Sequence, residues 1–134
     1  MYCKLFAIVL ICLSITEVHS QKTLFTNNCD MEYYVQDSIR MSDIDFQSGL
    51  LSILNCYKQG KDSLDLQIRV HVILSDEFDF HDLNQVLDIK EYFIDNSVSH
   101  SNVVYDFTRN KQYLLMYEET TKFALILNVV VSCL

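Results

Sequence analysis

The sequence contains no proline and only two glycines, Gly49 and Gly60. These absences exclude collagen-like and proline-rich proteins, and also the glycine-rich loops that bind nucleotide phosphates. Basic residues are few as well, since 10 lysines and arginines stand against 18 aspartates and glutamates, for a net charge of −8. A chain this acidic has no electrostatic attraction for nucleic acid or for anionic lipid.

The chain has 134 residues, of which 50% are hydrophobic and 21% are charged. This length fits one domain, and this composition is typical of a chain that folds. Residues 1–20 carry a positive charge at Lys4 near their start, continue with an apolar run of about eleven residues, and end with small residues at Val18 and Ser20. The pattern predicts a signal peptide cleaved before Gln21, and hence a secreted protein or one on the extracellular face of a membrane. The alternative is an N-terminal buried or membrane-anchored helix.

Three cysteines remain after the predicted cleavage: Cys29, Cys56 and Cys133. Secreted proteins form disulfides, and an odd number of cysteines leaves one without a partner in the chain. We favour a disulfide between Cys29 and Cys56, because both precede the predicted strands. Three free thiols are the alternative.

The spacing of apolar residues predicts one helix and several strands. Apolar residues at intervals of two to four indicate a helix over 43–57, and strict alternation over 64–72 indicates a half-buried strand. An acidic connection over 75–85 is followed by a second predicted strand over 86–94. Residues 21–41 form an N-terminal extension without a clear period.

The last third of the chain holds shorter patterns. Residues 103–107 and 112–117 are each predicted as a short strand. The apolar tail, residues 123–134, is too short to span a bilayer alone. We expect either a buried final strand or, if it stays unpaired, a segment prone to aggregate. Its origin stays open, because it is the natural end of the chain or the product of a misread intron.

Three groups of residues carry a resemblance to a known family. The helix holds Leu50, Leu51, Leu54 and Tyr57, the strand over 68–74 follows, and an acidic turn over 79–87 opens the second strand with Val-Leu. Together they resemble the ligand-binding domain of pentameric neurotransmitter-gated (Cys-loop) ion channels of the nicotinic acetylcholine receptor type. The family's disulfide loop, Trp-x-Pro-Asp block and membrane helices have no counterpart. The resemblance therefore implies a truncated ligand-binding domain over 42–122.

The fold implied by the resemblance is mainly β, a partial antiparallel β-sandwich with an N-terminal α-helix. The implied partners are receptor subunits of a pentamer and a small cationic neurotransmitter, held by cation–π attraction. The ligand-binding aromatic would be Tyr92 when counted from the acidic turn, or Phe93 when counted back from Val98. Such a chain would not conduct ions by itself, and it would reach a membrane only through missing C-terminal helices or partner subunits.

Other chemistry is weakly indicated. The spacing of His71, His81 and His100 matches no metal-ligand pattern, and the acidic residues of 75–85 lack the glycine and terminal glutamate of a calcium-binding loop. We expect no metal, no cofactor and no enzymatic activity. The alternative function, from a different class, is a small secreted α+β protein that acts by protein–protein interaction.

Overall fold

The computed structural model describes residues 24–26 and 29–132, so the predicted signal peptide lies outside the described residues. The elements, in chain order, are β1 (Leu24–Thr26), β2 (Asp30–Val35), α2 (Ile44–Gly60), β3 (Leu66–Leu74), α3 (Phe80–Asp95), the short 3-10 helix η1 (His100–Asn102), β4 (Val103–Arg109), α4 (Lys111–Tyr117) and β5 (Phe123–Val131). Among the helices described here, none has the length and apolar character needed to cross a membrane.

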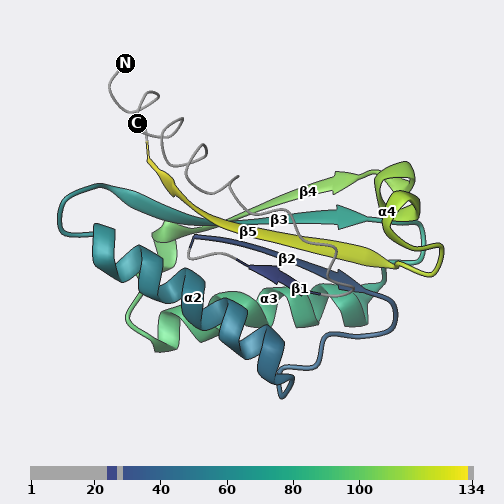
Figure 1. Cartoon of the computed structure of the whole chain (residues 1–134), viewed down its shortest axis with the longest axis horizontal. Helices are drawn as coiled ribbons and strands as arrows, with labels where there is room; N and C mark the ends of the chain where they lie inside the picture. The colour runs from purple at the N-terminus through teal and green to yellow at the C-terminus, as the bar shows by residue number, and fades with distance from the viewer. Residues whose placement is uncertain (1–23, 27–28, 133–134) are drawn as a thin grey trace.

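The strands form one mixed sheet in the order β1-β2-β5-β3-β4. Strand β5 runs antiparallel to both β2 and β3, whereas β4 runs parallel to β3. Helices α2 and α3 lie along one face of this sheet, and α4 lies at the end where β3 and β4 finish (Figure 1). The fold is therefore a mixed α/β sheet with a helical layer.

The predicted helix and the first predicted strand are confirmed as α2 and β3. The Asp43 side chain caps α2 by accepting hydrogen bonds from the backbone N–H groups of Asp45 and Phe46. A stripe of side chains along α2 is buried against the sheet, and its members are Phe46, Leu50, Ile53, Leu54 and Tyr57. Strand β3 buries every second residue from Leu66 to Val72 on the same side. Both elements fold as their periods require.

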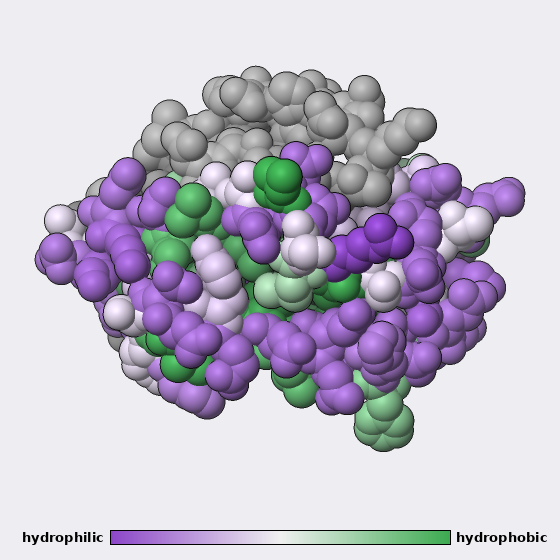
Figure 2. Space-filling model, turned by 90° about the horizontal axis from the view of Figure 1, so that it is seen from below, coloured by the Kyte–Doolittle hydropathy of each residue, from purple (hydrophilic) through white to green (hydrophobic). Residues whose placement is uncertain are grey.

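The core lies between the helices and the sheet. Its fully buried members include Met31 on β2, Ile68 on β3, and Leu125 and Leu127 on β5. Seen from the helix side, the surface over this core is mostly hydrophilic and is interrupted by apolar side chains (Figure 2). A smaller apolar cluster on the opposite face packs Leu114 of α4 against Ile73 and Ala124.

The prediction of a strand over 86–94 is wrong, because these residues belong to α3. Asp79 and Asp82 form a reciprocal capping box, in which each side chain accepts a hydrogen bond from the other residue's backbone N–H. Val86, Ile89 and Phe93 recur at intervals of three and four and are buried. The capped start and the helical period outweigh the β-propensity of the apolar residues. The strand predicted over 112–117 is also wrong, since it is helix α4.

The predicted partial antiparallel β-sandwich is wrong as well. The chain forms one mixed sheet, its β3–β4 pair is parallel, and a helix follows β3 where the receptor resemblance required a second strand. The resemblance to Cys-loop receptor ectodomains rested on that strand, so it falls with it. The strand predicted over 103–107 is confirmed as β4.

The apolar tail forms β5, which lies inside the sheet between β2 and β3. Its ladder to β2 runs from Phe123 to Asn128, and its ladder to β3 runs from Phe123 to Val131. Burial on both faces explains why this segment is apolar almost throughout. The two expectations for the tail thus resolve to a buried final strand.

Candidate functional site

Strand β4 forms an exposed edge of the sheet. It is the last strand in the sheet order, and none of the described strands pairs with its outer side. Apolar side chains accompany this edge, since Phe107 is 41% exposed, Val104 is 36% exposed, and Leu87 on α3 is 44% exposed. We call these three residues, with the outer side of β4, the β4 edge surface. Open edges of this kind are templates for pairing with another chain.

Tyr105 fixes this edge against α3. Its hydroxyl donates a hydrogen bond of 2.6 Å to the carbonyl of Val86 and accepts one of 3.1 Å from the backbone N–H of Lys90. Those are the two groups that an α-helix ordinarily pairs with each other, so the hydroxyl bridges one turn of α3. Burial raises the pKa of Tyr105 well above its ordinary value of 10.0, which keeps the hydroxyl protonated as a donor.

The phenol of Tyr105 also orients Phe107. The two rings stack at 5.9 Å between centroids with 15° between their planes. Because Tyr105 is anchored to α3, this stacking holds the exposed Phe107 ring on the helix side of the edge. The helix side of the β4 edge surface therefore presents a preformed apolar ring, while Val104 lies on the opposite face of the sheet.

Acidic groups lie near the β4 edge surface on both faces of the sheet. Asp88 and Glu91, both exposed on α3, lie close enough to Tyr105 to raise the pKa of its hydroxyl by their charge. On the opposite face of the sheet, Asp106 Oδ2 lies 2.9 Å from Nδ1 of His71, its partner in the β3–β4 register. The edge thus combines apolar contact area with negative charge on both faces.

A second polar cluster lies at the carboxyl ends of β3 and β4. The Nζ of Lys122 lies 2.9 Å from Oδ2 of Asp82 and 3.8 Å from Oδ2 of Asp79. The Ser75 hydroxyl donates to the Lys122 carbonyl at 2.6 Å, and Arg109 pairs with Asp76. These contacts fasten the loop after β3 to the start of β5.

The acidic connection is therefore used to hold the fold. Asp82 is fully buried, and its Oδ1 has no hydrogen-bond partner in the part of the chain described. The hydrogen bond to Asp82 raises the pKa of Lys122, and the hydrogen bond from the Asp82 backbone lowers the pKa of Asp79. The carboxylates act as a helix cap and a buried ion pair.

A polar hollow of about 330 Å³ opens at the other end of the molecule. It lies between the end of α2 and the start of β3, and Lys61, Asp62, Asp65 and Asn102 contribute to its lining. Asn102 donates a hydrogen bond of 2.8 Å to the Tyr57 hydroxyl. The hollow is shallow and carries both signs of charge, so it favours no particular ligand.

Tyr92 and Phe93, the predicted ligand-binding aromatics, both lie on α3. Phe93 is fully buried in the core, and Tyr92 is half-buried beside it with ring centroids 5.3 Å apart. Their predicted role was taken from a strand of the receptor fold. Since they lie on a helix, the receptor-based reason for a ligand-binding role does not apply to them.

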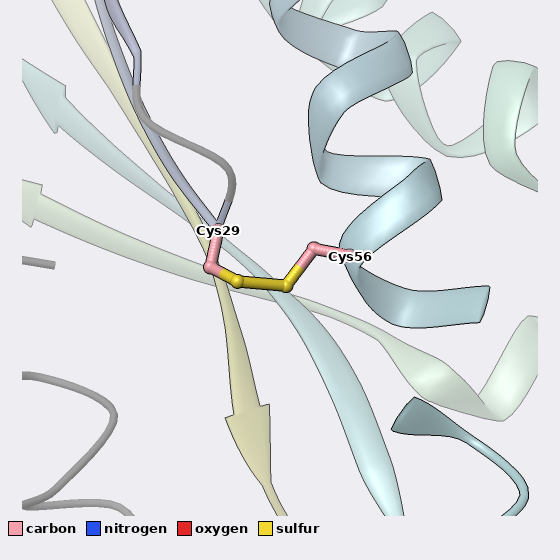
Figure 3. Close-up of a disulfide and its surroundings, with 2 residues drawn as sticks. All are labelled: Cys29 and Cys56. Atoms are coloured by element: carbon pink, nitrogen blue, oxygen red, sulfur yellow. A yellow bond between two sulfur atoms is a disulfide. The ribbon is translucent and has the colours of Figure 1, made fainter. Parts of the chain in front are cut away.

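The structure joins Cys29 and Cys56 in a disulfide with 5.4 Å between their Cα atoms. Figure 3 shows it linking the start of β2 to α2. This is the pair favoured by the sequence. Within the described ranges, no group of three or more His, Cys, Asp or Glu side chains could hold a metal ion.

Sequence reasoning missed the β4 edge surface. It also missed three tyrosines that gather beneath α4, where Tyr34 stacks on Tyr117 at 3.8 Å and shares a hydroxyl–hydroxyl hydrogen bond of 3.1 Å with Tyr113. The pKa of the Tyr34 hydroxyl is raised, mainly by its burial. Both features depend on which strands are neighbours, and no local pattern reports that.

Comparisons with known proteins give a fold likeness only. No family model matches the sequence, and no curated protein matches it. Among solved structures, the chain is similar to the OmpA-like domain of FopA1 from Francisella tularensis, with 8% identity over 81% of this chain and 79% of that one and a TM-score of 0.47. It is also similar to the periplasmic domain of MotB from Helicobacter pylori, with 14% identity over 82% and 79% and a TM-score of 0.42.

Neither structure is a receptor ectodomain, and identities and scores this low support no transfer of function. The predicted partners, receptor subunits of a pentamer and a small cationic neurotransmitter, depended on the receptor fold. With that fold excluded by the mixed sheet, the prediction of these partners is wrong.

Proposed function

We propose that this chain is a small exported α/β protein that acts by binding another protein and is not an enzyme. The observation that carries the proposal is the β4 edge surface, where an unpaired strand and exposed apolar side chains meet. Single exposed apolar residues are ordinary on protein surfaces. Here they accompany a free strand edge, and that combination is typical of sites where another chain adds to a sheet.

The disulfide supports export. Disulfides persist in oxidising compartments and are rare in the cytosol. Cys29 and Cys56 form one in the folded protein, and the signal-peptide pattern of residues 1–20 agrees with it. The expected location is the extracellular side of the cell that makes the protein.

Site-specific photocrosslinking tests the proposal. The disulfide-bonded chain is prepared with a photoreactive amino acid at one of several exposed positions, namely Phe107, Gln59, Met116 or Glu119. It is then irradiated in the extracellular fraction of the organism that makes it. We expect a discrete protein adduct from at least one position, which excess unlabelled chain competes away. If none of the four positions gives an adduct that unlabelled chain competes away, a protein-binding function is contradicted.

A further inference from the structure

We infer that the partner supplies an extended, basic segment that adds to the outer side of β4 as a further strand. This inference rests on the proposed function, and it names the surface, the mode of binding and the chemistry of the partner. Strand addition gains main-chain hydrogen bonds, and the side chains on either side of the added strand give specificity.

The backbone of β4 offers these hydrogen bonds at defined residues. The N–H of Asn110 donates to the Leu74 carbonyl of β3 at 3.1 Å. Since successive N–H groups of a strand alternate in direction, those of Thr108 and Asp106 also point toward β3. The N–H groups of Tyr105 and Phe107 therefore point outward, where an added strand would receive them.

The two faces beside the edge differ in chemistry. Phe107 and Leu87 lie on the helix side, and they favour apolar side chains in the added strand. Asp106 and the exposed Val104 lie on the opposite face, and the carboxylate of Asp106 favours a basic side chain beside it there. An added strand that alternates apolar and basic residues matches both faces at once.

Charge decides between a foreign partner and a second copy of this chain. The protein carries a net charge of −8, and Asp88 and Glu91 are exposed beside the edge. Pairing β4 with itself would bring two such acidic surfaces together, which like-charge repulsion opposes. A basic segment is attracted by the same groups, so we commit to it as the occupant.

The probe is a heptapeptide of alternating lysine and valine, and its control is the corresponding glutamate–valine peptide. Binding to the full mature chain is measured by NMR titration together with amide hydrogen exchange. We expect saturable binding of the lysine peptide only, with slowed exchange at the outward amides of Tyr105 and Phe107. Slowed exchange at other strands, or equal binding of both peptides, would overturn the inference.

Substitutions locate the site independently. Phe107→Pro removes one outward N–H and leaves the ladder to β3 intact, so we expect affinity to fall at least about tenfold. Phe107→Thr keeps the outward N–H, so its affinity for the peptide should fall by less. Glu91→Lys should weaken binding several-fold, whereas Glu119→Lys, the same charge change on an exposed residue away from β4, should not. Equal loss in the two lysine variants would overturn the role of local charge.

The outcomes separate this inference from the proposed function. A dimer of the free chain that Phe107→Pro abolishes would show that the occupant is a second copy, and would overturn the inference. A competed protein adduct that forms from Gln59 but not from Phe107 would also overturn it, while the protein-binding function would stand. The absence of any adduct would remove both. If Phe107→Pro does not fold, the exchange pattern of the wild-type chain still decides.

Discussion

Removing the Cys29–Cys56 disulfide should lower the free energy of unfolding by about 3.5 kcal/mol. The two cysteines are 27 residues apart in the sequence. In the chain-entropy account, a closed loop of that length costs the unfolded chain about 12 cal/mol/K, which is about 3.5 kcal/mol at 25 °C. The perturbation is the double substitution of Cys29→Ser and Cys56→Ser.

The folded state should change little, which makes this magnitude testable. The Cys29 carbonyl accepts a hydrogen bond of 3.1 Å from the Val129 backbone, and β2 keeps its full ladder to β5. Cys56 lies within α2, where it is half-buried against the core, and serine is close to cysteine in size. The cost therefore falls mainly on the unfolded state, which becomes more extended without the crosslink.

The assay is equilibrium unfolding in urea of the mature chain, with Cys133→Ser in both proteins so that no third thiol interferes. We expect a lower midpoint and a steeper dependence on urea in the double variant, because a more extended unfolded chain exposes more surface. Reductant should lower the stability of the parent protein to that of the variant. A difference below about 1 kcal/mol would refute the entropic reasoning.

Three further predictions test the core and the charged cluster. Phe93→Ala should lower the free energy of unfolding by about 3–5 kcal/mol in urea melts, and Tyr92→Ala by clearly less; equal losses would contradict the different burial of the two rings. Lys122→Met should lower the free energy of unfolding by about 3 kcal/mol, because it leaves the buried Asp82 carboxylate without its cation. Adding Asp82→Leu to that variant should restore most of the lost free energy. The pKa of Asp79 is lowered in the fold, so its contribution is present above its ordinary value of 3.8 and is lost as pH falls below it. Asp79→Asn keeps a helix cap and should flatten the pH dependence of the urea midpoint in that acid range; an unchanged slope would contradict the lowered pKa.

The parts of the fold that sequence predicts are those with one clear period. Helix α2 buries one stripe and β3 buries every second residue, so each signals its type without help from the rest of the chain. The predicted bounds of the helix, 43–57, differ by a few residues from those of α2, because helix ends depend on their caps. For α2 the final turn extends to Gly60. Its backbone lies close to the Leu66 side chain, so that an added Cβ would lie 2.7 Å from Leu66 Cδ1.

The sequence predicts a strand in place of helix α3 because two signals compete in one segment. Its apolar residues include neighbours such as Tyr92, Phe93 and Ile94, which favour a strand when read alone. The capping box of Asp79 and Asp82 is the signal that could have decided for a helix. By composition the same residues predict an acidic connection between two strands, and the receptor resemblance agrees with that interpretation.

The candidate site was beyond sequence reasoning for a different reason. Whether β4 lies inside the sheet or at its edge is set by β5, which returns from the end of the chain to pair with β2 and β3. Had β5 paired with β4 instead, the outward N–H and C=O groups of β4 would be used within the sheet, and no free edge would lie beside Phe107. The same seven residues thus form a free edge strand or an interior strand according to a pairing made some twenty residues later. The free edge of β4 is consequently a property of the strand order, and it can be recognised only from the whole sheet.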